Sequence, residues 1–288
     1  MVLSVRTTAG EEYLRLTTET LQSIRLGHPT TGVWEAADLQ WWWRKDQHPD
    51  PARQSFWVHD GSPVAAVVLS DWGDRLSLDL LVPERGRTEL LDLMEPVAIQ
   101  MTDNAGGVPL EMVVRDDDPV MIALASRLRF KPSAEVGADA WLAPAHAPPQ
   151  APLPERFTIG SRDEFSDREH PMAARNGPHV AQRLEECGLY QQSLDLAIYG
   201  PDQEVAAYGL FWADPVTEVG LVEPIRTNDA LQRRGLGSAL LRAGITRLVD
   251  RGCTRIKVTY LLDNEASRRL YAGCGFAVVV TCTTYQRD

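Results

Sequence analysis

A short glycine-containing loop carries the strongest chemical signal in the sequence. It runs from Gln232 to Ser238, reads QRRGLGS, and lies between an expected strand and an amphipathic helix. Two glycines at this spacing, Gly235 and Gly237, let the backbone turn tightly and approach a ligand closely. The start of the next helix offers unpaired N–H groups and the positive end of the helix dipole. The loop is a candidate phosphate-binding site, although a structural turn with solvated arginines has the same pattern.

A second group of candidate residues follows in the next expected helix. Asn264 stands where that helix begins, and Tyr271 follows seven residues later, so both lie on similar faces. A phenol with an ordinary pKa of about 10 can donate a proton to a leaving group. Each residue also has a structural explanation, because asparagine is a common N-cap and a tyrosine can pack beneath a sheet. The sequence leaves both readings open.

The elements that position these residues follow from hydrophobic periodicity. In the second half, strands are predicted over 156–159, 194–199, 205–212, 219–226, 255–261 and 276–285, and helices over 163–175, 180–188, 236–251 and 265–272. Hairpins come first and strand–helix alternation follows. This order predicts an α/β fold of the α+β kind, with a mixed sheet flanked by helices.

The chain is expected to divide once, at a proline-rich segment. Residues 143–154 hold five prolines and no Asp, Glu, Lys or Arg, a composition typical of an extended linker. The predicted domains are therefore 1–142 and 155–288. The first repeats the element order of the second, with helices over 11–23, 35–45, 88–100 and 119–128 and strands over 55–59, 64–70, 76–82, 110–114 and 138–142. Two tandem copies of one fold are the economical explanation.

Composition excludes several classes of protein. The chain has 288 residues, of which 44% are hydrophobic, and a formal net charge of −11. That charge is a poor basis for binding nucleic acid, and the longest apolar runs are too short for a membrane span. No signal peptide is visible, so we expect a cytoplasmic protein. Its four cysteines lack metal-site spacing and are predicted to be buried and reduced, and no metal is expected.

Three segments in order resemble the GNAT superfamily of acyl-CoA-dependent N-acyltransferases. The loop Gln232–Ser238 is similar to the Q/R-x-x-G-x-G/A pyrophosphate loop of that family. Residues 220–227 resemble its fourth strand, and residues 264–276 resemble its N-x-x-(A/S)-x-x-(L/F)-Y-x-x-x-G-F helix. The resemblance covers about residues 156–288 and implies two tandem GNAT-like folds, the second of them catalytic.

The resemblance implies acetyl-CoA as cosubstrate and assigns the site residues. Tyr271 is the expected acid that protonates the departing thiolate. Glu223 is the best-placed base or amine anchor, and Glu218 is second. Pro224 is expected at a bulge, since it lacks an N–H. The N–H of Ile225, or that of a neighbour, is expected to face the thioester oxygen. The residues expected to bind the cosubstrate are Ile225, Arg226, Thr227, Gln232, Arg233, Arg234, Gly235, Leu236, Gly237, Ser238, Asn264 and Ser267.

The first half departs from this pattern. Its loop, residues 83–88, reads PERGRT, with one glycine and a nearby acid. Aligning Phe130 with Phe276 places Asp118 opposite Asn264 and Ala125 opposite Tyr271, so the proton donor is missing. This resembles the degenerate N-terminal half of tandem acetyltransferases, a group that includes mycothiol synthases.

Three consecutive tryptophans, Trp41 to Trp43, are the most unusual feature of the first half. On a helix they point in different directions, so they either pack against the other domain or line a substrate cleft.

The sequence predicts an N-acetyltransferase that acts on a primary amine, by direct attack in a ternary complex. A small-molecule acceptor is favoured because the acidic first half suits a cation. The alternatives are a non-catalytic acyl-CoA-binding sensor or structural module and a mycothiol-synthase-like acetyltransferase. A homodimer is possible through exposed strand edges.

Overall fold

Two compact units divide the chain in the computed structural model, which describes residues 3–44 and 50–287. The first unit comprises residues 1–39, 46–138 and 280–288, and the second comprises residues 40–45 and 139–279. A single cut would give two continuous halves. Here residues 40–45 belong to the second unit, and residues 280–288 belong to the first. The linker at 143–154 and the domain bounds drawn from it stay a prediction.

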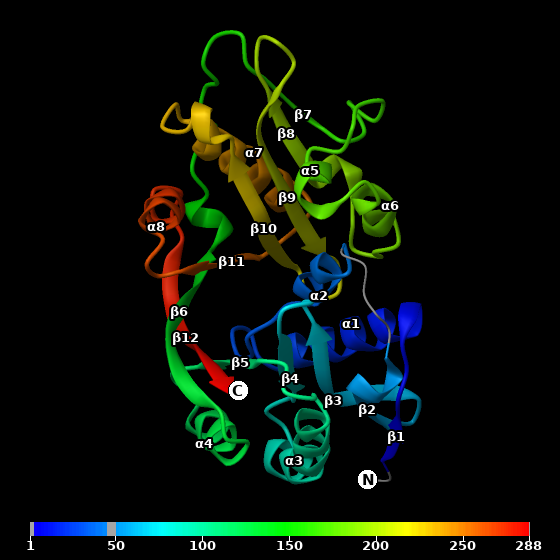
Figure 1. Ribbon diagram of the computed structural model, residues 1–288. Coiled ribbons are helices and arrows are strands. Elements are labelled where there is room, and N and C mark those ends of the chain that lie inside the picture. Colours follow the sequence, from blue (N-terminus) through cyan, green and yellow to red (C-terminus); the bar gives the residue numbers. More distant parts are fainter. Residues whose placement is uncertain (1–2, 45–49, 288) are drawn as a thin grey trace. The chain divides into compact units, whose positions relative to one another are not determined.

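The first unit is a mixed sheet with helices (Figure 1). Its strand order is β1-β2-β3-β4-β5-β12. The elements are β1 (Ser4–Arg6), α1 (Gly10–Gly27), α2 (Ala36–Trp42), η1 (Pro51–Arg53), β2 (Gln54–His59), β3 (Ser62–Asp71), β4 (Leu76–Leu81), α3 (Arg87–Asp103), β5 (Leu110–Arg115), α4 (Pro119–Arg127), β6 (Lys131–Leu142) and β12 (Ala277–Arg287). Helix α2 and strands β6 and β12 continue into the second unit along the chain.

The core of the first unit forms around β3 and β4. Helices α1 and α3 both pack on these two strands, and β3 is buried at consecutive positions from Ala65 to Leu69, so both faces of the sheet are covered. Met94 and Leu124 contribute fully buried side chains from α3 and α4 to the core cluster. Helix α4 begins as its sequence dictates, because Asp118 accepts a hydrogen bond from the Met121 N–H and a proline follows the cap.

The second unit is also a mixed sheet with helices, in the order β6-β11-β10-β9-β8-β7. Its further elements are η2 (Pro144–His146), β7 (Thr158–Ser161), α5 (Ala173–Asn176), α6 (Val180–Glu185), η3 (Gln192–Leu194), β8 (Asp195–Tyr199), β9 (Val205–Asp214), β10 (Val219–Thr227), η4 (Asp229–Leu231), α7 (Leu236–Asp250), β11 (Arg255–Leu261) and α8 (Glu265–Ala272). Helix α7 packs on β8, β9 and β10 through its apolar stripe (Figure 1).

One predicted helix is wrong. Residues 163–172 form turns, bends and irregular backbone, and the predicted range 163–175 is helical only from Ala173 onward, in α5 (Ala173–Asn176). The guanidinium of Arg162 donates to the carbonyl oxygens of Phe165 and Arg168, which a helix would use for its own hydrogen bonds. Pro171 also lacks the N–H that a continuous helix needs.

Candidate active site

Strands β10 and β11 separate at the centre of the second unit. Their parallel pairing joins Val219–Leu221 to Arg255–Lys257, while β10 continues to Thr227 on its other partner, β9. The register with β9 shifts between Val222 and Ile225, at the cis peptide bond of Glu223 and Pro224. The bulge predicted at this proline is therefore confirmed. Beyond it, one edge of β10 faces the gap between the two strands.

Hydrogen-bond alternation shows which backbone groups face this gap. The N–H of Asn228 donates to the carbonyl of Ala206, so the next hydrogen-bonded pair along β10 and β9 is Arg226 with Tyr208. Ile225 lies at the intervening position, and its N–H and C=O therefore point away from β9. The N–H of Ile225 is directed toward the gap, where a bound carbonyl oxygen could accept from it.

The loop before α7 presents a row of unpaired backbone donors. Arg233 and Gly235 both have positive φ angles, of 62° and 82°, which turn successive N–H groups toward one side. Within the described chain, the N–H groups of residues 233–238 have no hydrogen-bond acceptor. A Cβ on Gly237 would lie 3.2 Å from Oγ1 of Thr227, so the loop approaches the end of β10 closely.

The side chains of the loop leave this row of donors open. Gln232 turns outward and donates from Nε2 to Asp229 Oδ1 at 2.8 Å, and Ser238 Oγ accepts from Arg242 Nε at 3.2 Å. Leu236 is buried and fixes α7 to the core, whereas Arg233 and Arg234 are exposed. Neither arginine has a carboxylate partner among the described residues.

Helix α8 carries Tyr271, whose ring packs against Tyr260 on β11. Asn264 caps this helix by accepting from the Ser267 N–H at 3.1 Å, so the N-cap explanation for Asn264 is confirmed and its contact with a cosubstrate stays a prediction. Tyr271 is 7% exposed, and its ring lies 5.4 Å from that of Tyr260 and 5.8 Å from that of Phe276. Aromatic packing on two sides fixes the direction of the phenol.

The two predicted catalytic residues lie close enough to influence each other. Burial and the nearby carboxylate of Glu223 both raise the pKa of Tyr271, which keeps its proton on the phenol. Burial also raises the pKa of Glu223 above its usual range, opposed by the positive charges of Arg44 and Lys257 and by a hydrogen bond from Trp41. The site thus pairs a protonated phenol with a carboxylate whose proton affinity is increased.

Sequence reasoning missed the residues that hold Glu223. Trp41 and Arg44 come from a segment of the first half of the chain, yet this segment belongs to the second unit. The Arg44 guanidinium lies 3.6 Å from the Trp41 ring centre and donates to Asn176 Oδ1 at 2.9 Å. Burial lowers the pKa of Arg44 to about 10. The run of three tryptophans was the available signal, but nothing in it indicated a carboxylate partner.

Further hydrogen bonds fix the segment that contains Trp41 and Arg44 within the second unit. Trp43 donates from Nε1 to Glu186 Oε2 at 2.8 Å, and the side chain of Gln40 accepts from the Leu189 N–H at 2.8 Å. Because these bonds hold residues on either side of Trp41, they position its side chain for the hydrogen bond with Glu223. A role for the tryptophans in lining a substrate cleft stays a prediction.

A buried ion pair lies next to the same carboxylate. Lys257 is fully buried on β11, and its Nζ is 3.2 Å from Oδ2 of Asp139, whose other oxygen accepts from Thr259 at 2.8 Å. Because the lysine is already paired, its charge only partly offsets the effect of burial on Glu223. The prediction that the four cysteines are buried is confirmed.

A divided parallel pair, a bulge at the division and a cradle of N–H groups at the next helix define the fold of an acyl-CoA-dependent N-acyltransferase. Residues 161–276 match the acetyltransferase (GNAT) family. The second half of the chain therefore carries a GNAT acetyltransferase domain, and the whole chain has a tandem GNAT fold. GNAT acetyltransferases use acetyl-CoA.

Two curated relatives match most of the chain. A mycothiol acetyltransferase of Nocardioides sp. is 28% identical over 264 residues, covering 82% of this chain and 85% of the relative. A mycothiol acetyltransferase of Nocardiopsis dassonvillei is 29% identical over 247 residues, covering 84% of this chain and 66% of the relative. Both are distant homologues.

Solved structures share the tandem fold over almost the whole length. A tandem GNAT protein from the clavulanic acid biosynthesis pathway has a TM-score of 0.67 at 14% identity, covering 99% of this chain and 98% of its own. A GCN5-related N-acetyltransferase from Sphaerobacter thermophilus has a TM-score of 0.62 at 15% identity, covering 99% and 95%. The predicted α/β fold of two tandem GNAT-like copies is confirmed. No helix of the described residues is long and apolar enough to cross a bilayer.

Proposed function

We propose that the second unit transfers an acetyl group from acetyl-CoA to a primary amine of a small molecule, by direct attack in a ternary complex. The observation that carries the proposal is the gap between β10 and β11, which joins the Ile225 N–H to the donor cradle of residues 233–238. An extended acyl thioester arm fits along the free edge of β10, and its diphosphate fits the cradle.

The cradle and its surroundings account for most of the expected cosubstrate contacts. The N–H groups from Arg233 to Ser238 bind the diphosphate oxygens, and the unpaired side chains of Arg233 and Arg234 add positive charge. Backbone groups of Ile225, Arg226 and Thr227 pair with the amide-containing arm. Gln232 lies in the loop before α7, and Asn264 and Ser267 lie at the start of α8.

Each step of the transfer has a group in place. Glu223 accepts a proton from the ammonium form of the acceptor, and the free nitrogen attacks the thioester carbonyl carbon. The N–H of Ile225 stabilises the oxyanion that forms. As the carbon–sulfur bond breaks, Tyr271 donates its proton to the departing thiolate. The products are an N-acetyl amide and a free thiol, because the attacking nitrogen passes its remaining extra proton to the tyrosinate and Glu223 releases its proton to solvent.

The relatives favour one kind of acceptor. Both are mycothiol acetyltransferases, so an amine joined to a sugar and a thiol, as in mycothiol synthesis, is one specific candidate. The acceptor side of the site differs from a simple cation pocket, because Glu223 is accompanied by Arg44. The acceptor that we propose is therefore a small molecule with a primary amine.

The test measures free thiol released from acetyl-CoA by the full chain. The amine panel contains cysteinyl-glucosaminyl-inositol, polyamines, aminoglycosides and amino acids. Thiol release that depends on one amine, with the acetylated product identified by mass spectrometry, supports the proposal. Tight coenzyme A binding without turnover on the whole panel contradicts it and supports the alternative of an acyl-CoA sensor.

A further inference from the structure

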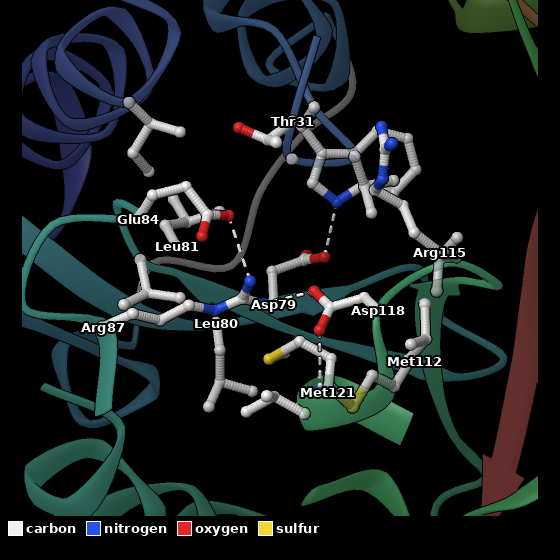
Figure 2. A pocket seen from close by; sticks show the side chains of 18 of the residues that line it. Thr31, Asp79, Leu80, Leu81, Glu84, Arg87, Met112, Arg115, Asp118 and Met121 are labelled. Carbon is white, nitrogen blue, oxygen red and sulfur yellow. Dashed lines mark hydrogen bonds and ion pairs between the residues drawn. The ribbon is translucent and has the colours of Figure 1, made fainter. Parts of the chain in front are cut away.

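A cavity of about 540 Å³ lies in the first unit, where the sequence predicts no catalytic residue. It opens between β4, β5 and the segment after α1, and most of its lining is apolar (Figure 2). Leu21, Ile24, Leu80, Met112 and Met121 contribute to this lining. The volume is within the range of sites for small organic ligands.

One carboxylate is buried in this apolar lining. Asp79 on β4 is 6% exposed, and its Oδ1 accepts from Trp34 Nε1 at 2.6 Å, as Figure 2 shows. Its other oxygen, Oδ2, is buried without a hydrogen-bond partner. Burial raises the pKa of Asp79 to about 6, and only the indole opposes this effect. At neutral pH the cavity therefore holds an ionised carboxylate with one free oxygen.

The two arginines of the cavity are committed to other acids. Arg87 forms ion pairs with Glu84 and Asp118. Arg115 donates from two nitrogens to Asp117, each at 2.9 Å, and to the carbonyl of Thr30 at 2.6 Å. Four carboxylates thus line the cavity against two guanidinium groups, and Asp79 is the one without an ion-pair partner among the described residues.

We propose that this cavity binds a small organic ammonium ion with an apolar body, whose nitrogen donates to Asp79. An ammonium group supplies both the missing hydrogen bond to Oδ2 and the missing positive charge. The apolar body displaces water from the leucine and methionine lining. An anionic ligand is disfavoured because the acids outnumber the arginines.

Two further polar atoms shape the expected ligand. Oγ1 of Thr31 and Nε of Arg87 are also buried without hydrogen-bond partners. Thr31 and Arg87 line the cavity together with Asp79, as Figure 2 shows. A hydroxyl or ether oxygen on the ligand would pair with them, so an amino alcohol is the favoured form of the ammonium ion.

The experiment follows methyl NMR signals of the full chain while probes are added. Met112 and Met121 line the cavity, and both carry a methyl reporter. The probes are hexylammonium, hexanol and hexanoate, which differ mainly in the charge of the head group. The variants are Asp79→Asn, the exposed control Asp92→Asn on α3, and Met121→Trp, which fills the cavity. Circular dichroism verifies the fold of each variant.

We expect hexylammonium to shift both methionine signals in a saturable way. Asp79→Asn should weaken this binding by about tenfold or more, because a buried charge partner is lost, while hexanol binding stays unchanged. Asp92→Asn should leave it unchanged, and Met121→Trp should abolish the shift of Met112. Equal affinity of the Asp79→Asn variant, stronger binding of hexanoate, or no shift with any probe would overturn the proposal. None of these outcomes depends on acetyl transfer by the second unit.

Discussion

The two units share a divided pair of parallel strands. In the second unit, β10 and β11 pair from Val219–Leu221 to Arg255–Lys257, and in the first unit β4 and β5 pair only from Leu76–Ser77 to Leu110–Glu111. In both units the strands continue beyond the pairing, so a cavity or gap opens between them. The backbone arrangement is therefore common to the half with the candidate active site and to the degenerate half.

Helices α4 and α8, the last helices of the two halves of the chain, share two backbone features. Asp118 caps α4 as Asn264 caps α8, each accepting from the N–H three residues later. The N–H of Phe130 donates to the carbonyl of Ala125 at 2.9 Å, and the N–H of Phe276 donates to that of Tyr271 at 3.1 Å. These bonds confirm the alignment that placed an alanine opposite the tyrosine.

The difference lies in the side chains at the two helix entrances. Gly86 and Gly235 have the same left-handed conformation before α3 and α7. Before α3, Glu84 pairs with Arg87, whereas before α7 neither Arg233 nor Arg234 has a carboxylate partner in the part of the chain that the structure describes. The first unit keeps the splayed strands but lacks both the unpaired arginines before the helix and the tyrosine. Backbone pairing specifies the strands, whereas single side chains supply the charges and the phenol, so the two can differ independently.

The largest effect is expected from removing the phenol that the first unit lacks. Tyr271→Phe keeps the aromatic packing against Tyr260 but removes the proton donor, so kcat should fall by about a thousandfold. The affinity for coenzyme A should stay within about twofold, since the donor cradle is untouched. Steady-state thiol release and calorimetry measure the two quantities.

Tyr260→Phe is the matched control, because it removes a hydroxyl from the ring stacked on Tyr271 without touching the predicted acid. Its kcat should remain near that of the unmodified enzyme. If Tyr271→Phe turns over normally, the tyrosine is a packing residue and the contrast with Ala125 loses its catalytic meaning.

The next effect concerns the carboxylate that only the second unit places at its bulge. Glu223 must be ionised to accept a proton, and its pKa is raised, so activity should fall as pH decreases through that raised value. Glu223→Gln should lower kcat/KM by about a hundredfold and abolish this acidic limb. The measurement is a pH–rate profile with a fixed amine.

Glu218→Gln serves as the control, since Glu218 is an exposed acid at the start of β10. It should leave the profile unchanged. An acidic limb that persists in the Glu223→Gln variant would assign it to another group, such as the amine of the substrate.

The sequence predicted what adjacent residues specify. The loop before α7, the cap at Asn264 and the bulge at Pro224 depend on neighbours within one turn or strand. The support of Glu223 by Trp41 and Arg44 was not predictable, because their contact joins distant parts of the chain and alternation within a strand does not reveal it. The helix predicted over 163–175 failed for a different, local reason, because the Arg162 side chain binds the carbonyl oxygens of Phe165 and Arg168 that a helix would use.

The buried carboxylate in the first-unit cavity should lower the free energy of unfolding at neutral pH. The pKa of Asp79 is raised from 3.8 to about 6, so the folded state binds its proton more tightly than the unfolded state. Ionising Asp79 in the folded state therefore reduces the free energy of unfolding. This reduction is absent below about pH 4 and complete above about pH 6, where it reaches up to about 3 kcal/mol. Asp79→Asn should therefore stabilise the protein at pH 8 by about 2 kcal/mol, since its amide accepts a weaker hydrogen bond from Trp34.

Urea denaturation at pH 8 and pH 4.5 measures this difference. The gain in the free energy of unfolding should shrink at the lower pH, and Asp92→Asn should show no gain at either pH. A loss of stability in the Asp79→Asn variant at pH 8 would mean that the carboxylate has a stabilising partner, which leaves no free oxygen for a cation.

The smallest expected effect comes from giving the second loop the charge of the first. Aligning Gly86 with Gly235 places Glu84 opposite Arg233, so Arg233→Glu makes the second entrance resemble the first. An exposed charge acts at high dielectric and is screened by salt, so the affinity for coenzyme A should fall by about tenfold in low salt and by less at high salt. Lys131→Glu makes the same change in charge on the first unit and should have little effect. Equal losses in both variants would show that net charge matters rather than the entrance to α7, and the comparison between the two loops would then explain nothing about cosubstrate binding.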